Sequence, residues 1–192
     1  TLKNVKLSYF TLNGLGMVPR MLLSYGKVPF ENHTITFDKW PEVKPTMQLK
    51  FLPQLEVNGA IYSQSQAISV FLARKVGGLM GKNEEEEYQI IAILNSTPDI
   101  NPTLYKLVMP SEEDQKPENA KVNLQNAIDK ITLFLSVYEK RYESNGEGKY
   151  YLGEKLSLAD FWLVSTVGNF ILKTLGESLG KKKKKAAPKL IA

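Results

Sequence analysis

The spacing of hydrophobic residues changes character partway along the chain. Up to about Gly78 the apolar runs are short and alternate between the spacings typical of strands and of helices. From Glu84 onward, apolar residues recur at intervals of three and four, which indicates helices almost throughout. The pattern therefore predicts two domains, residues 1–80 with strands and helices and residues 81–192 made of helices, with a linker over 81–87.

The first domain opens with a β-α-β pattern. Strands are expected over 5–10 and 34–37, where β-branched and aromatic residues are frequent. A short helix is expected between them over 19–25. Gly14 and Gly16 end the first strand, because glycine interrupts regular structure.

A hairpin and a helix complete the first domain. Asn58-Gly59 between two apolar runs predicts a β-hairpin, since both residues of such a turn must accept positive φ. Ser63 and Ser65 are expected to cap the helix that follows. The predicted order is therefore βαβ–ββα.

Three features define the helical half. A long helix is expected through the region of Pro98 and Pro102, bent or interrupted at these prolines. A second helix carries an apolar stripe at i, i+3/i+4 spacing: Leu124, Ile128, Ile131, Leu135, Tyr138 and Tyr142. Ser157 followed by Asp160 predicts an N-cap with an acidic partner at N3, and hence the start of a third helix.

Composition limits the chemistry. The sequence has no cysteine, which excludes disulfides and thiol chemistry and fits a reducing compartment, so we expect a cytoplasmic protein. The single histidine, His33, argues against a multi-histidine metal site and is expected to be a surface or packing residue. No apolar run approaches the roughly 18 residues needed to span a bilayer, and no secretory signal opens the chain, so no membrane association is expected.

The net charge of +5 arises from one segment. The lysine run 181–185 contributes five positive charges, and the rest of the chain sums to zero. Aromatic and arginine residues do not alternate with these lysines, so no nucleic-acid binding is expected. The run is read as a solvated loop, with a weak contact to an acidic partner as the alternative.

Five motifs in sequence order resemble the glutathione transferases, and the sigma-like class in particular. They are KLSYF at 6–10, WPEVKP at 40–45, LPQLEVNG at 52–59, QSQAI at 64–68 and LSLADF at 156–161. The resemblance covers most of the chain. It implies a thioredoxin-like glutathione-binding domain followed by an all-helical domain, with glutathione as co-substrate and no metal.

This resemblance implies a catalytic role for Tyr9. A thiol such as that of glutathione has a pKa near 8.5, so little of it is thiolate at neutral pH. A hydroxyl aimed at the sulfur stabilises the thiolate and lowers that pKa. Taken alone, Tyr9 is better explained as a strand aromatic packed in the core; the surrounding family motifs reverse this preference and favour the donor.

The resemblance also implies residues for the charged ends of glutathione. Ser65, at a helix N-terminus, and Gln64 would bind the γ-glutamyl carboxylate. Lys44 and the indole of Trp40 would bind the glycyl carboxylate. The alternatives are plain helix capping for Ser65 and an ordinary surface lysine for Lys44. In sigma-like dimers an aspartate of the other subunit binds the amine, and alignment gives Asp99 this place.

The segment before the hairpin is expected to present backbone to the ligand. A cis peptide bond at Pro53 would turn Leu52 toward glutathione, where its backbone would pair with the cysteinyl amide. Pro19 replaces the acidic residue that relatives have early in the first helix. Two further positions, close to the expected ligand, also depart from the family. Leu15 stands where relatives have an arginine near the thiol, and Phe51 stands where they have Gln or Lys at the glycyl end.

Two functions follow as hypotheses. The first is a homodimeric glutathione transferase with a detoxification role, which joins the glutathione thiolate to a hydrophobic electrophile. The sequence does not distinguish this activity from that of an isomerase of the prostaglandin D synthase kind. The second is a weak or inactive member that serves as a scaffold or as a subunit of a larger assembly, which Leu15 and Phe51 favour. Relatives continue with a further helix beyond the position of Ala192, so either the sequence is truncated or one wall of the electrophile pocket is absent.

Overall fold

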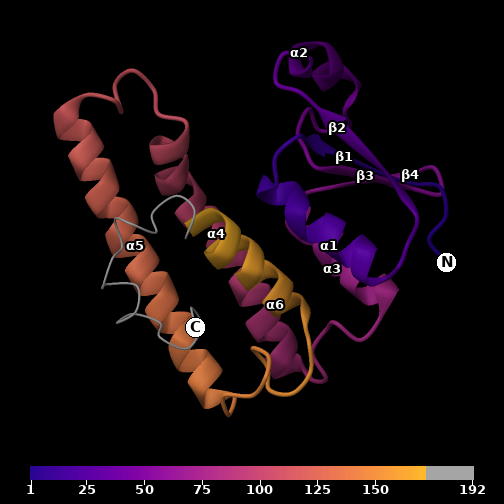
Figure 1. Ribbon diagram of the computed structural model, residues 1–192. Coiled ribbons are helices and arrows are strands. Elements are labelled where there is room, and N and C mark those ends of the chain that lie inside the picture. Colours follow the sequence, from indigo (N-terminus) through magenta and orange to yellow (C-terminus); the bar gives the residue numbers. More distant parts are fainter. Residues whose placement is uncertain (172–192) are drawn as a thin grey trace. The chain divides into compact units, whose positions relative to one another are not determined.

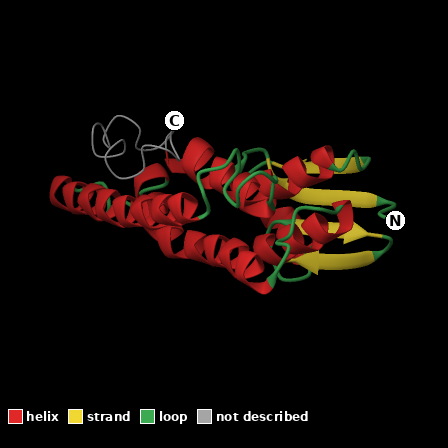
Figure 2. Cartoon of the chain, turned by 90° about the horizontal axis from the view of Figure 1, so that it is seen from below, coloured by secondary structure: helices red, strands yellow, loops and turns green. Residues whose placement is uncertain are grey.

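The computed structural model describes residues 1–171 and divides the chain into two compact units, Thr1–Ile90 and Ile91–Ala192. The division falls inside a long helix, α4 (Glu84–Val108). All strands of the described residues belong to the first unit, whereas the described part of the second is helical (Figure 2). The lysine run 181–185 lies outside the described residues.

The first unit is a four-stranded sheet with helices on both sides. Its strands are β1 (Val5–Phe10), β2 (Phe30–Ile35), β3 (Gln54–Val57) and β4 (Ala60–Ser63). They lie in the order β2-β1-β3-β4; β2 runs parallel to β1, and the other pairs are antiparallel. Helices α1 (Met17–Tyr25) and α3 (Ser65–Val76) lie below the sheet in Figure 1, and the short α2 (Trp40–Val43) lies above it. This arrangement confirms the predicted βαβ–ββα order and the thioredoxin-like fold.

Alternation along β1 and β3 gives the sheet one apolar and one polar face. The buried apolar positions of these strands are Val5, Leu7, Leu55 and Val57. The positions between them carry polar side chains: Lys6, Ser8, Gln54 and Glu56. Tyr9 has the parity of Leu7, so its ring belongs to the apolar side, where it is 5% exposed.

The second strand begins earlier than the sequence indicates. β2 occupies Phe30–Ile35 and pairs with all six residues of β1, whereas a strand over 34–37 was expected. Phe37 therefore lies outside the strand and is 53% exposed. Pairing with β1 set the strand start, and the local β-branched residues were a misleading guide. His33 lies within β2, where its Nδ1 is 3.0 Å from the hydroxyl of the buried Ser8.

The hairpin prediction is confirmed and the capping prediction is wrong. Asn58 and Gly59 have φ of 53° and 81°, as this type of turn requires. Neither Ser63 nor Ser65 occupies the N-cap of α3. Gln64 does, without a side-chain capping bond, because β4 ends at Ser63 and the chain reverses direction at Gln64 with φ 72°.

The second unit is built around α4. This helix continues through Pro98 and Pro102, so the prolines do not interrupt it. The indole N–H of Trp162, on α6, donates to the hydroxyl of Thr97 at 2.6 Å. On another side, the phenol of Tyr138 donates to the carbonyl of Ala92 at 3.0 Å. Contacts with neighbouring helices hold α4 together where its own backbone bonds are lost.

Helix α5 (Pro117–Ser144) confirms most of the predicted stripe. Ile128, Ile131, Leu135 and Tyr138 are buried. Leu124 and Tyr142, at the outer ends of the stripe, are half-buried.

None of the helices within residues 1–171 has the length and apolar character needed to cross a bilayer. Across the same residues, no three His, Asp or Glu side chains gather as a possible metal site.

Helix α6 (Leu158–Leu163) starts at the predicted capping box and passes into a π-helical segment, Val164–Ile171. One carboxylate oxygen of Asp160 accepts the N–H and the O–H of Ser157, both at 2.8 Å. The other oxygen accepts the N–H of Tyr151 at 2.7 Å. Asp160 therefore ties the start of the buried helix to the segment that precedes it.

Replacing Asp160 by alanine should destabilise the protein. The change leaves the N–H groups of Ser157 and Tyr151 without their acceptor, at an expected cost of about 2 kcal/mol in the free energy of unfolding. Urea denaturation followed by circular dichroism measures this loss. Asp129→Ala, at an exposed position of α5, serves as the control and should change stability by less than about 0.5 kcal/mol. Equal stability of the two variants would contradict the capping role.

Candidate functional site

Tyr9 lies near the end of β1, and its phenol group meets the loop that follows. The backbone N–H of Leu15 donates a hydrogen bond to the phenol oxygen at 2.9 Å. This bond uses a lone pair of the oxygen and not its hydrogen. A hydroxyl oxygen that accepts an N–H is also polarised toward stronger donation, because hydrogen bonds in a chain reinforce one another.

Two glycines allow the loop to approach the ring this closely. A Cβ at Gly14 would lie 2.6 Å from the Tyr9 phenol oxygen, and Gly14 has φ of +34°. A Cβ at Gly16 would overlap Cδ1 of the ring and lie 2.6 Å from its Cγ. Side-chain carbons do not approach so closely without displacing their neighbour. The glycines that the sequence pattern marked as the end of a strand therefore also make room for Tyr9.

Arg20, on α1, holds the same loop from its other side. Its guanidinium donates to the carbonyls of Leu12 at 2.9 Å and Phe10 at 3.0 Å. It also donates to the side-chain oxygen of Asn32 on β2, at 3.0 Å. The guanidinium carbon is 5.6 Å from the centre of the Tyr9 ring. Burial lowers the pKa of Arg20, and the neighbouring Tyr9 opposes that effect.

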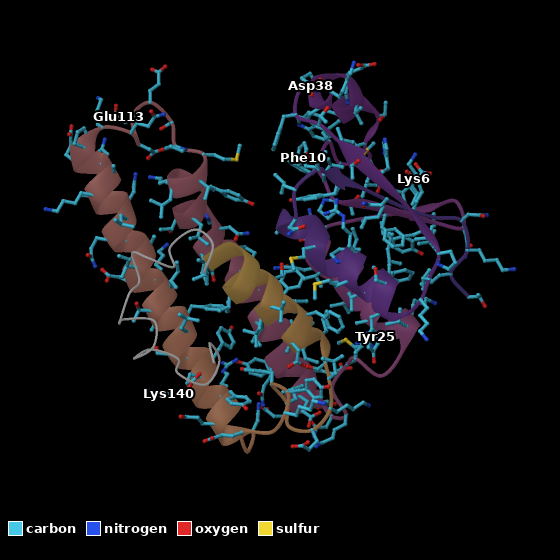
Figure 3. The ribbon with its side chains drawn as sticks, viewed as in Figure 1. Lys6, Phe10, Tyr25, Asp38, Glu113 and Lys140 are labelled. Atoms are coloured by element: carbon cyan, nitrogen blue, oxygen red, sulfur yellow. The ribbon has the colours of Figure 1, made fainter. Side chains whose placement is uncertain are left out.

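An aromatic cluster connects β1 to α2. Phe10 and Lys6 mark the two ends of β1 in Figure 3. The ring of Phe10 contacts that of Trp40 edge-on, with centroids 5.4 Å apart, and stacks on Phe37 at 4.7 Å. Trp40 begins α2, and Lys44 follows in a 3₁₀ turn, Lys44–Thr46, where it is exposed. Within the described part of the chain its ammonium group has no ion-pair partner.

The segment before β3 contains a cis peptide bond and an exposed aromatic residue. The Leu52–Pro53 peptide bond is cis. Leu52 is half-buried and Pro53 is buried. Phe51 is 67% exposed, so most of its side chain is left uncovered by the first unit.

The start of α3 has an unusual backbone conformation. Gln64 has φ 72° and ψ 111°, which residues other than glycine rarely adopt and which is found most often at functional sites. The first hydrogen bond of the helix runs from the N–H of Ile68 to the carbonyl of Gln64, at 2.9 Å. The N–H of Ser65 precedes that bond, at the positive end of the helix dipole, which is a suitable place for a carboxylate.

The predicted residues thus fall in four places in the first unit and one in the second. Tyr9 lies near the end of β1, Trp40 and Lys44 lie at α2, Phe51 to Pro53 precede β3, and Gln64 and Ser65 begin α3; Asp99 lies on α4 and is exposed. Sequence reasoning missed the role of Gly14, Gly16 and Arg20. The two glycines, so close after the strand, were a usable signal of close backbone approach, whereas nothing in the pattern marked Arg20.

Comparison with known proteins places the chain in a family. Residues 99–192 match the family model "Glutathione S-transferase, C-terminal domain". A glutathione S-transferase of Anopheles gambiae is 34% identical over 171 residues, which are 88% of this chain and 81% of that protein.

Solved structures give the same result. Prostaglandin synthase D of Nilaparvata lugens superposes with a TM-score of 0.79 at 29% identity, covering 98% of this chain and 92% of the other. A sigma class glutathione transferase of Fasciola hepatica gives a TM-score of 0.76 at 28% identity, with 98% and 87% covered. The chain belongs to the glutathione S-transferase family and is a glutathione transferase by class.

Substituting Gly16 by alanine should displace the Tyr9 ring. The added Cβ overlaps the ring, and overpacking of this kind costs about 1–3 kcal/mol in the free energy of unfolding. Thermal unfolding measures the loss, and tyrosine fluorescence or NMR reports the movement of the ring. Gly168→Ala is the matched control, because a Cβ there meets nothing within 4 Å. If Gly16→Ala were as stable as Gly168→Ala, the loop would not be packed against Tyr9 as described.

Proposed function

We propose that this protein joins the thiolate of glutathione to hydrophobic electrophiles, with Tyr9 as the hydroxyl that stabilises the thiolate. The observation that carries the proposal is the hydrogen bond from the Leu15 N–H to the Tyr9 oxygen. It fixes the phenol at the end of β1 and favours donation by its hydroxyl. The family membership supplies glutathione as the thiol. We expect the activity to serve detoxification in the cytoplasm.

The chemistry needs only a shift in one protonation equilibrium. The thiol of free glutathione, with a pKa near 8.5, is mostly protonated at neutral pH. A donated hydrogen bond favours the charged form of sulfur and lowers that pKa, so more of the bound peptide is the nucleophile. The thiolate then attacks the electrophilic carbon and forms a carbon–sulfur bond, and any displaced group leaves with the electron pair of its own bond.

The peptide ends are assigned to the predicted residues as part of the proposal. The γ-glutamyl carboxylate would bind the N-terminus of α3 at Ser65, with Gln64 beside it. The glycyl carboxylate would bind Lys44 and the indole N–H of Trp40, which the contact with Phe10 holds in place. The backbone of Leu52 would pair with the cysteinyl amide. Exposure of Lys44 and the unusual backbone of Gln64 support these assignments.

A homodimer would complete the site. An exposed carboxylate on α4, Asp99, is available to a second copy of the chain and would bind the γ-glutamyl amine there.

The exposed side chain of Phe51 favours a second candidate function, a weakly active member that serves as a scaffold, because exposed apolar side chains mark interaction surfaces.

Replacing Tyr9 by phenylalanine tests the first function. Loss of a hydrogen bond to a charged group costs about 1.5–3 kcal/mol, so kcat/KM for chlorodinitrobenzene conjugation should fall about 10- to 100-fold. The pKa of the bound thiol, read from thiolate absorbance against pH, should rise. Retention on immobilised glutathione should persist, because the peptide ends are bound elsewhere.

The control for this experiment is Tyr25→Phe, at a tyrosine of α1 that is 50% exposed, which should keep wild-type activity. Wild-type protein that neither binds glutathione nor turns over would favour the scaffold. Unchanged thiol pKa in Tyr9→Phe would remove the proposed role of Tyr9.

Asp99→Asn tests the contribution of a second subunit. Loss of an ionic hydrogen bond to the amine should weaken glutathione binding about tenfold or more in calorimetry. Sedimentation should show a dimer for both proteins. Asp129→Asn, at an exposed position of α5, should bind glutathione normally. A monomer that binds glutathione with full affinity would refute the role of Asp99.

A further inference from the structure

A buried amide ties the loop that precedes the hairpin to β3. Gln54, the first residue of β3, is 3% exposed although its side chain is polar. Its side-chain oxygen accepts the backbone N–H of Gln48 at 2.9 Å. Its amide nitrogen donates to a carboxylate oxygen of Glu56 at 3.3 Å. Both ends of this amide are therefore hydrogen-bonded, as burial requires.

A second hydrogen bond extends the connection to the end of the hairpin. The hydroxyl of Ser63 donates to the side-chain oxygen of Gln48 at 3.2 Å. Ser63 is also the strand partner of Gln54 in the pairing of β3 with β4. Gln48 thus contacts Gln54 through its backbone and Ser63 through its side chain, and we call Gln48, Gln54 and Ser63 the glutamine bridge.

The glutamine bridge lies between the segments to which the proposed function assigns the two ends of glutathione. Gln48 belongs to the loop that connects Lys44 with Leu52. Ser63 immediately precedes Gln64, where the backbone has φ 72° and α3 begins. Gln54 holds the loop to β3, and Gln48 links that loop to Ser63, so these two contacts together limit the distance between the two segments. That distance must match the length of the bound peptide, because a misplaced contact loses most of its energy.

Rigid placement explains why a polar residue occupies this buried position. An apolar side chain at position 54 could be buried equally well and would need no hydrogen-bond partners. It would, however, leave the N–H of Gln48 without an acceptor. The loop would then lose the hydrogen bond that ties it to β3. The polar choice is consistent with a requirement for fixed geometry, since fully satisfied buried networks specify one arrangement.

We propose that Gln54 is a positioning residue that sets the span of the glutathione site, by holding the 44–52 loop and the start of α3 at a fixed separation. The inference rests on the proposed function. Gln54 contacts neither the sulfur nor Tyr9 in this proposal, so it should influence glutathione affinity and leave the chemical step unchanged.

Gln54→Met is the decisive variant, because methionine matches glutamine in length and removes both hydrogen bonds. Its KM for glutathione should rise about tenfold, the effect of losing the part-buried hydrogen bond that holds the loop to β3. Its kcat at saturating glutathione and the pKa of the bound thiol should match the wild type. Hydrogen exchange of the Gln48 amide in the absence of glutathione should accelerate.

Gln48→Ala and Ser63→Ala separate the second contact from the first. Each removes the same side-chain hydrogen bond and leaves the backbone N–H of residue 48 bonded to Gln54. Each should therefore raise the glutathione KM less than Gln54→Met does. The double variant should be no weaker than either single variant, because the two changes remove one shared interaction.

Asn123→Leu is the matched structural control. Asn123, in the second unit, is 8% exposed and donates to Asp114 at 2.9 Å. This variant should lose stability and keep the glutathione KM. If Gln54→Met and Asn123→Leu changed kcat and KM alike, Gln54 would be an ordinary structural residue and the inference would be overturned.

The possible outcomes distinguish a failure of this inference from a failure of the proposed function on which it rests. Wild-type protein that does not bind glutathione would overturn both. Normal wild-type binding with an unchanged KM in Gln54→Met would overturn the inference alone. Faster exchange at Gln48 together with an unchanged KM would show that the glutamine bridge exists but does not determine the spacing of the glutathione site. This result would also overturn the inference.

Discussion

The N–H of Leu15 donates to the phenol oxygen of Tyr9, and this contact requires a loop that folds back tightly onto β1. Gly14 and Gly16 permit the approach, because a Cβ at either position would collide with the tyrosine. Arg20 keeps the loop in place through the carbonyls at residues 10 and 12. The phenol is thus positioned mainly by backbone groups, which do not depend on side-chain rotamers and lose little entropy when a ligand binds.

The elements that the sequence predicted well are those with local causes. Asn58-Gly59 defined its hairpin because the turn depends on two residues alone. The Ser157 and Asp160 capping box marked a helix start for the same reason. β2 was predicted less accurately because its partner strand decides where it begins, and the course of α4 at its prolines also depends on its neighbours. The start of β2 follows from pairing with β1, and α4 runs past Pro98 because helices on two sides hold it.

In the candidate site too, features with local causes were predictable from the sequence and features that depend on neighbouring segments were not. Its side chains could be proposed from motifs, since Tyr9, Trp40 and Lys44 stand in recognisable segments. The backbone conformations that surround them could not. Gln64 takes a positive φ that no propensity favours, and neither serine beside it caps the helix. Gln54 looked like an ordinary strand residue, because a polar position in β3 does not reveal that its amide is buried and bonded to the preceding loop.

The two departures from the family become easier to interpret when backbone and side-chain roles are separated. At position 15 the chain lacks an arginine side chain, yet the group that contacts Tyr9 is a backbone N–H, which leucine supplies equally well. At position 51 a polar side chain is absent, yet the assigned contact to the cysteinyl amide belongs to the backbone of Leu52. Loss of side-chain donors at both positions is therefore compatible with glutathione binding. The loss at position 51 should weaken affinity for the glycyl end of the peptide more than it alters the thiolate, because the thiolate depends on the Tyr9 loop.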